Sequence, residues 1–216
     1  MNREFLKREF LILFVLVVPI IFLVAVWNQL PKQLPIHWNI EGKVDNYGPK
    51  YLMAVLTIGL YVLLLILPRI DPRRKNYDIF SETYFKLRLI LILFFGIINS
   101  IIIANAIGFE INVSRIIGIS VLLLFVIIGN YLGNLRPNWF IGIRLPWTLE
   151  SNVVWKKTHY LAGRLWFWLG IAALILSIFL PVNFLYPLIF SVVMVMAIVP
   201  VVYSYLIFKK ERKPET

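Results

Sequence analysis

Six long apolar segments constrain this sequence more than any other feature. Each is close to the roughly 20 residues that an α-helix needs to cross the hydrocarbon core of a bilayer. Hydrophobic residues make up 60% of the chain, against about 45–50% in soluble domains. We therefore predict an all-α integral membrane protein with six transmembrane helices. The predicted spans are Phe10–Trp27, Tyr51–Leu67, Leu87–Ile107, Ile116–Tyr131, Leu165–Leu180 and Leu185–Phe208.

The basic residues predict the orientation of these spans. If the N-terminus faces the cytoplasm, 18 of the 22 Lys and Arg residues lie in inner segments, and only Lys32, Lys43, Lys50 and Arg115 lie in outer loops. Cytoplasmic segments of membrane proteins carry the excess of Lys and Arg, so both termini are predicted to be cytoplasmic. Topology and anionic inner-leaflet lipid then explain the net charge of +11, and no nucleic-acid partner is expected.

The spans and their loops predict one polytopic membrane domain over residues 1–216. Within it, residues 1–70 form an N-terminal helix pair with a polar outer loop at residues 28–50. Residues 87–208 form a four-helix part with a long inner loop at residues 132–164.

The predicted spans hold no acidic residue. All eleven Asp and Glu residues fall outside them, and Glu9 falls immediately before the first span. Ion-coupled transporters usually need an ionisable group at membrane depth, so an ion pump is not expected. Uncharged polar residues do occur within the spans, notably Asn99 and Asn105.

The segment GNYLGN, residues 129–134, repeats small and amide side chains at a helical spacing. Gly129 and Gly133 share one helix face, as do Asn130 and Asn134. The pattern predicts a close packing face with amides bonded across helices. A ligand-facing role for the asparagines is the alternative.

The outer loop concentrates polar and aromatic side chains. Its prolines and glycines rule out a long helix and predict a compact loop built from turns. Metal binding by His37 with Glu41 or Asp45 has weak support, because a catalytic zinc site needs three protein ligands. We expect no metal and no cofactor. An ordered loop with an interfacial Trp38 and a ligand-binding loop both remain open. The candidate ligand-binding residues are His37, Trp38, Asn39, Glu41, Asp45 and Tyr47.

The inner loop contains NWFIGIRLPWT, residues 138–148. Thr148 is predicted to cap a helix that lies in the membrane interface and leads into the fifth span. The tryptophans of this region, Trp155 among them, are predicted to anchor it at headgroup level. Arg144 has two interpretations: binding of a lipid phosphate, or bracing of the loop through carbonyl oxygens.

No catalytic motif is present in the sequence. Ser151 and His159 are eight residues apart, more than two helical turns, which is too far for direct proton transfer along one helix. The chain has neither a G-x-S-x-G elbow nor an H-E-x-x-H motif. His37 and His159 fall on opposite sides of the predicted membrane. The protein is therefore not expected to be an enzyme.

Two polar stretches resemble known protein families. LPIHWNIEGKVDNYGPK is similar to the Pro-x-His-x-Asn-x-x-Gly-x-x-Asp-x-Tyr loop of a small bacterial membrane domain of unknown function. GNYLGNLRPNWFIGIRLPWTLESNVVWKKTHYLAGRLW resembles the signature of the SdpI family. The residues that carry this second resemblance are Gly129, Asn130, Asn138, Gly142, Arg144, Pro146, Trp147, Trp155, Thr158, His159 and Gly163.

The resemblance implies a multi-pass protein of the bacterial cytoplasmic membrane. The founding type of the family confers immunity to a secreted toxic peptide, so we expect such a peptide as a partner at the outer face, alongside membrane lipid. The motif residues of the inner loop are expected to be structural or signalling. The alternative is a membrane sensor that recruits a cytoplasmic regulatory protein, and a membrane enzyme using His37 or His159 has less support.

Overall fold

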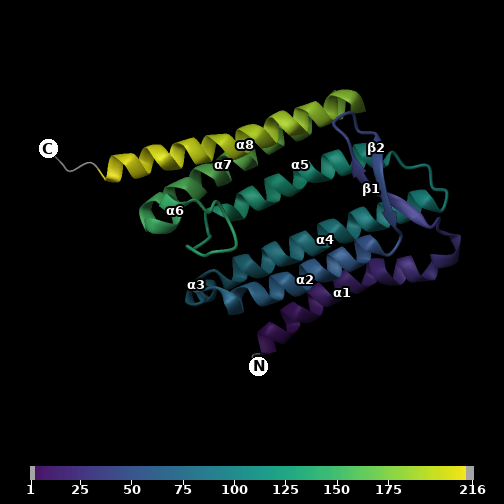
Figure 1. The fold of residues 1–216 in the computed structure, drawn as a ribbon, viewed down its shortest axis with the longest axis horizontal. Coiled ribbons are helices and arrows are strands. Elements are labelled where there is room, and N and C mark those ends of the chain that lie inside the picture. The colour runs from purple at the N-terminus through teal and green to yellow at the C-terminus, as the bar shows by residue number, and fades with distance from the viewer. Residues whose placement is uncertain (1–2, 213–216) are drawn as a thin grey trace. The chain divides into compact units, whose positions relative to one another are not determined.

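A computed structural model describes residues 3–212 of the chain. Lys213, one of the predicted inner basic residues, lies outside this range. The described part contains six helices long and apolar enough to cross a membrane, which confirms the predicted fold class. These helices (Figure 1) are α1 (Arg3–Ala25), α2 (Leu52–Ile70), α4 (Ser81–Ala106), α5 (Val113–Leu132), α7 (Asn152–Phe179) and α8 (Val182–Glu211).

Short elements connect the long helices. The predicted compact outer loop is a β-hairpin, a structure that the sequence did not predict. Its strands β1 and β2 pair antiparallel, with Gln33 opposite Pro49, and the register shifts on either side of His37. The short elements are the 3₁₀ helix η1 (Trp27–Gln29), strands β1 (Gln33–Trp38) and β2 (Val44–Pro49), and helices α3 (Lys75–Ile79) and α6 (Pro146–Glu150).

Two compact units can be distinguished along the chain. The first unit comprises the described residues of Met1–Leu65, Phe85–Ser120 and Leu180–Pro187. The second comprises Ile66–Tyr84, Val121–Phe179 and the described residues of Leu188–Thr216. Four of the long helices, α2, α4, α5 and α8, contribute to both units.

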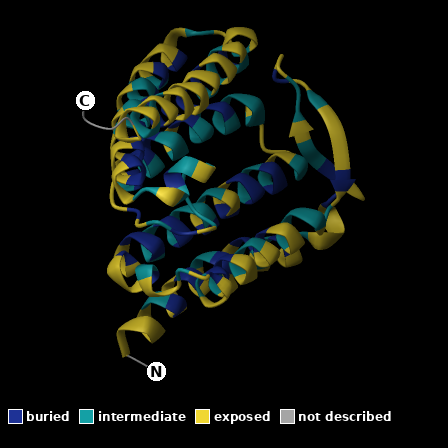
Figure 2. Cartoon of the chain, turned by 60° about the vertical axis from the view of Figure 1, so that its left-hand side comes forward, coloured by how far each residue is buried: buried dark blue, intermediate teal, exposed yellow. Residues whose placement is uncertain are grey.

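The hydrophobic core of the first unit joins α1 and α4 to the hairpin. Leu23 of α1, Leu34 of β1 and Ile102 of α4 are each at most 5% exposed and belong to one buried cluster. Figure 2 shows buried positions where helices face their neighbours and exposed positions along much of the remaining helix surface. In a membrane protein that remaining surface faces lipid, so exposed apolar side chains are expected there.

Small residues bring α5 and α7 close together in the second unit. A Cβ atom added at Gly163 would lie 2.7 Å from the carbonyl oxygen of Gly129, closer than real side chains approach. The predicted packing role of Gly129 is therefore confirmed. Asn130 and Asn134 are exposed rather than buried between these helices.

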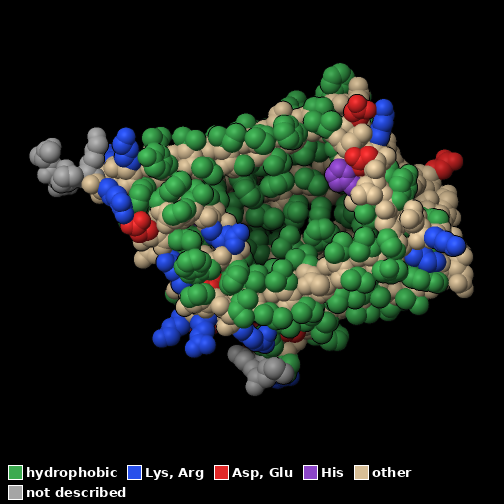
Figure 3. Space-filling model, viewed as in Figure 1, with side chains coloured by type: hydrophobic (Ala, Val, Ile, Leu, Met, Phe, Trp, Pro, Cys, Tyr) green, Lys and Arg blue, Asp and Glu red, His purple; other side chains and the backbone are tan. Residues whose placement is uncertain are grey.

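The helix predicted to lead into the fifth span is continuous with that span. Helix α7 runs without a break from Asn152 to Phe179, so the residues that were expected to lie in the interface form its first turns. Figure 3 shows a visible face that is largely hydrophobic along the helices, with Lys and Arg side chains gathered mainly at helix ends.

Candidate functional site

The turn of the hairpin, residues 39–43, is built around the side chain of Asn39. Its Oδ1 atom accepts hydrogen bonds from the backbone N–H groups of Glu41 and Lys43, each at 3.0 Å. Gly42 has a φ of +75°, which only glycine adopts without strain. Asn39 therefore shapes the turn, and its side chain is committed to that role.

The hairpin is fixed to the starts of α5 and α8. The Ser114 hydroxyl donates to the carbonyl oxygen of Gly42 at 2.6 Å, and the Tyr186 hydroxyl donates to the carbonyl oxygen of Ser114 at 3.0 Å. A Cβ atom at Gly42 would lie 2.8 Å from the Tyr186 ring. The turn is thus held closely against two helix ends.

A pair of ionisable side chains projects from the two strands. His37 Nδ1 lies 2.5 Å from Asp45 Oδ1, and the two side chains are 64% and 42% exposed. Tyr47 is 54% exposed, Glu41 is exposed beside the turn, and Trp38 packs against the core. The hairpin therefore presents His37, Glu41, Asp45 and Tyr47 to the surroundings, while Trp38 positions it.

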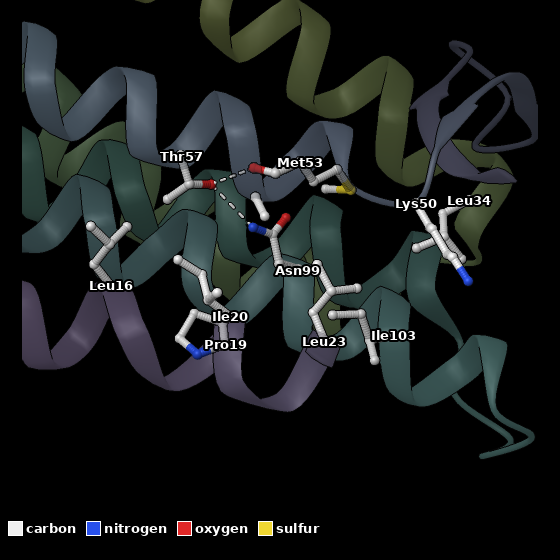
Figure 4. Close-up of a pocket in the computed structure, with 11 residues that line it drawn as sticks. Leu16, Pro19, Ile20, Leu23, Leu34, Lys50, Met53, Thr57, Asn99 and Ile103 are labelled. Atoms are coloured by element: carbon white, nitrogen blue, oxygen red, sulfur yellow. Dashed lines mark hydrogen bonds between the residues drawn. The ribbon is translucent and has the colours of Figure 1, made fainter. Parts of the chain in front are cut away.

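A small pocket lies under the hairpin in the first unit. Residues of α1, α2 and α4 line it together with Leu34 of β1 and Lys50, which follows β2. The Asn99 amide donates to the Thr57 hydroxyl at 3.1 Å, and Thr57 donates to the carbonyl oxygen of Met53 at 2.8 Å. In Figure 4 the oxygen of Asn99 points away from Thr57. Within residues 3–212 this buried oxygen has no hydrogen-bond partner.

A buried ion pair in the first unit joins Glu9 of α1 to Arg88 of α4. Glu9 and Arg88 are only 9% and 5% exposed, and Arg88 binds both carboxylate oxygens, at 2.5 and 2.8 Å. The Tyr61 hydroxyl donates to the same carboxylate at 3.1 Å. The helices extend beyond the predicted spans, so Glu9 lies within α1. The helices also include Glu4, Glu82 and Glu211, which were predicted to lie outside the spans.

In the second unit, Asn138 is the centre of the inner loop. The residue is fully buried, and its oxygen accepts from the backbone N–H groups of Phe140 and Ile141 at 3.0 and 2.6 Å. Its amide donates to the carbonyl oxygens of Arg136 and Ile141 at 2.9 and 3.0 Å. One side chain thereby satisfies four backbone polar groups of a loop that has no regular secondary structure.

His159 holds the same loop from helix α7. Its Nε2 atom accepts from the backbone N–H of Ile143 at 2.9 Å, and its Nδ1 atom lies 2.9 Å from the carbonyl oxygen of Trp155. A carbonyl oxygen can only accept and an amide can only donate, so the ring is neutral with its proton on Nδ1. Trp155 stacks on His159 and donates to the carbonyl oxygen of Leu135 at 2.9 Å. The anchoring prediction is wrong for Trp155, which is 1% exposed.

Three further side chains of the inner loop form hydrogen bonds within the protein. The Thr148 hydroxyl accepts from the backbone N–H of Leu145 at 2.8 Å and lies inside α6, so the prediction of Thr148 as the helix cap is wrong. Arg144 donates to the carbonyl oxygen of Trp139 at 2.9 Å, which is the bracing role among its two interpretations. Trp147, next to Pro146 at the start of α6, donates to the Ser204 hydroxyl at 2.8 Å.

Comparison with known proteins finds one match that includes the hairpin and another that includes most of the inner loop, residues 132–164, called the signature loop below. The SdpI/YfhL protein family model matches residues 134–204, and a domain of unknown function, DUF1648, matches residues 14–63. The chain is 23% identical over 176 residues to the immunity protein SdpI of Bacillus subtilis strain 168, covering 81% of this chain and 83% of that protein. This chain is similar to the SdpI family over residues 134–204. No solved structure matches it.

Asp71 is a buried residue that the sequence analysis did not single out. It is 2% exposed, and its carboxylate accepts from the backbone N–H groups of Arg73 and Trp139, at 2.7 and 2.9 Å. The Tyr77 hydroxyl donates to Asp71 at 3.1 Å and also lies 3.3 Å from the Asn138 oxygen. Burial and the adjacent Asp71 carboxylate raise the pKa of Tyr77 well above its ordinary value. Asp71 thus ties the α2–α3 connection to the signature loop.

Five motif residues make these contacts within the inner loop or between that loop and α7, and we call them the clasp: Asn138, Gly142, Thr148, Trp155 and His159. Gly142 has a φ of +104° and leaves no room for a side chain beside the His159 ring. Thr158 is also fully buried, on the same helix as Trp155 and His159. Among the residues that the structure describes, no cluster of three or more His, Cys, Asp or Glu side chains is placed to hold a metal ion.

Proposed function

We propose that this chain is an immunity protein of the bacterial cell membrane that binds a secreted, membrane-active toxic peptide at the outer face. The observation that supports it is the anchored hairpin with its exposed His37–Asp45 pair. Similarity to the immunity protein SdpI supports the immunity role. The proposed contact residues are His37, Glu41, Asp45 and Tyr47, with Trp38 and Asn39 positioning them.

The pocket under the hairpin supports a deeper contact for the same peptide. Leu34 and Lys50 connect the hairpin to this pocket, and the free oxygen of Asn99 offers an acceptor inside it. An acceptor without a donor is costly in an apolar interior. The pocket has a volume of about 10 Å³, which admits a donor group about the size of one water molecule. Such a group, reaching in from a peptide bound at the hairpin, would relieve that cost.

The test is survival of sensitive bacteria that express the chain under a panel of membrane-active peptides. We expect selective protection by the wild type and its loss in a triple variant, His37→Gln, Asp45→Asn and Tyr47→Ala. The matched control replaces Lys209 and Lys210 with Ala, which are exposed residues in the last turn of α8. Full protection by the triple variant, with its insertion verified, would contradict binding by the hairpin.

The orientation is tested separately by chemical labelling. The chain contains no cysteine, so in the single variants Tyr47→Cys and Lys156→Cys any labelling comes from the introduced cysteine. A membrane-impermeant maleimide applied to intact cells is expected to label the first and spare the second. The reverse pattern would place the hairpin in the cytoplasm and exclude an extracellular peptide as its ligand.

A second proposal is a sensor that recruits a cytoplasmic regulatory protein. It is supported by Arg74 and Lys75, which are exposed next to a connection that Asp71 holds in place. Arg73 is less suited to such contacts because it donates to the carbonyl oxygen of Leu149 at 2.7 Å. Co-purification of a soluble protein, lost in the Arg74→Ala/Lys75→Ala variant, would support this role.

A further inference from the structure

A wide groove in the second unit is not used by the proposed function. It has a volume of about 1250 Å³ and is lined by residues of α3, by the starts of α4 and α7, and by residues 133–137, which follow α5. Trp155 of the clasp forms part of its wall, but the other clasp residues lie elsewhere. These helix ends flank apolar spans, and the groove therefore lies at the level where lipid headgroups meet the protein.

The charge of the groove favours an anion. Arg136, Lys156 and Lys157 line it, against a single acidic residue, Glu82. Within residues 3–212, the side chains of these three basic residues take part in no hydrogen bond or ion pair. Asn134 and Asn152 add further amide groups to the wall. Arginine and lysine are the side chains that proteins most often use to bind phosphate.

Apolar side chains accompany these charges in the same groove. Ile79, Val153 and Tyr160 line it and are 64%, 46% and 61% exposed. On α7, Val153, Lys157 and Tyr160 follow one another at helical spacing, so a basic side chain lies between two apolar ones on one face. A soluble anion would leave this apolar surface in water, whereas a phospholipid would cover it with its chains.

We propose that the groove binds one anionic phospholipid. Arg136, Lys156 and Lys157 hold its phosphate and headgroup, and Ile79, Val153 and Tyr160 contact the start of its acyl chains. Anionic headgroups are attracted to basic sites next to transmembrane helices, which gives this ligand its preference over a zwitterionic lipid. The proposal is independent of toxin binding, because none of its residues belongs to the hairpin.

Native mass spectrometry of the purified full chain tests the site. The probes are phosphatidylglycerol and phosphatidylcholine, titrated in separate and mixed samples. The wild type is expected to retain phosphatidylglycerol in preference to phosphatidylcholine. The Lys156→Ala/Lys157→Ala variant is expected to bind phosphatidylglycerol about 25-fold more weakly, at roughly fivefold for each basic residue. Replacing both lysines by Arg is expected to preserve binding.

The matched control is Lys209→Ala/Lys210→Ala, which removes two exposed charges from the last turn of α8, outside the groove. The affinity of this variant for phosphatidylglycerol is expected to stay within about twofold of the wild type, because Lys209 and Lys210 attract the anionic lipid only at a distance and do not contact it. An equal loss in both double variants would show diffuse attraction and overturn the site.

Two further outcomes also overturn the proposal. Displacement of phosphatidylglycerol by inorganic phosphate at equal concentration would show that the groove recognises free phosphate. Absence of any preference over phosphatidylcholine, together with binding of polyglutamate, would assign the groove to an acidic polypeptide instead. Thermal unfolding of each variant in the same detergent separates a lost site from a lost fold.

Discussion

Arg88 binds both carboxylate oxygens of Glu9, although the two residues lie 79 positions apart in the sequence. The pair is almost fully buried and links α1 to α4. Removing one member of a buried pair leaves the other charge without compensation, which typically costs roughly 3–5 kcal/mol. The pair therefore links one face of α1 to one face of α4.

We predict that Glu9→Leu lowers the free energy of unfolding by roughly 3–5 kcal/mol, whereas Glu9→Leu with Arg88→Met restores most of the loss. Thermal unfolding of the purified chain in detergent measures both. The control is Glu4→Gln, which affects an exposed pair with Lys7 at 4.0 Å and should cost less than about 1 kcal/mol. A double variant no more stable than Glu9→Leu would contradict the ion pair as the cause.

A second prediction concerns the contact of Gly142 with His159. Gly142→Ala imposes a strained φ and also places a methyl group against the ring, so it should destabilise the protein by more than strain alone, which is roughly 1–3 kcal/mol. Gly108 provides the matched control, because its φ is +106° and the space around it is open. Equal unfolding temperatures for the two Ala variants would show that the His159 contact has no energetic role.

The sequence predicts the membrane spans better than the hairpin or the contacts of the inner loop, for physical reasons. The six spans follow from runs of apolar residues, a local signal that survives any tertiary arrangement. The hairpin escaped prediction because its strands have only six residues and contain prolines. The hydrogen bond from the Trp139 N–H to Asp71 crosses 68 positions and depends on helix packing that no local pattern encodes. The motif around Asn138 was identified by resemblance, but its clasp geometry needed the structure.

A third prediction uses the pH dependence of Tyr77. Its raised pKa means that the folded state keeps the phenol proton at pH values where the unfolded chain releases it. The resulting stability is present below about pH 10 and is lost as the pH rises above that value. Tyr77→Phe should be less stable at neutral pH by about 1–2 kcal/mol, and the difference from wild type should shrink above pH 10. A difference that stays constant with pH would contradict this account.

The last prediction separates stability from protection at Asn99. Asn99→Leu removes a buried oxygen that has no partner within the described residues, and Thr57 keeps its bond to the Met53 carbonyl. The unfolding temperature should therefore stay unchanged or rise, since an unsatisfied buried acceptor typically costs about 1–3 kcal/mol. If the pocket receives a donor from the toxic peptide, protection should fall in the same variant. Thr57→Val, which keeps the Asn99 oxygen but removes the partner of its amide, should lower stability instead. Reduced stability together with unchanged protection in Asn99→Leu would show that Asn99 serves the fold and not the peptide.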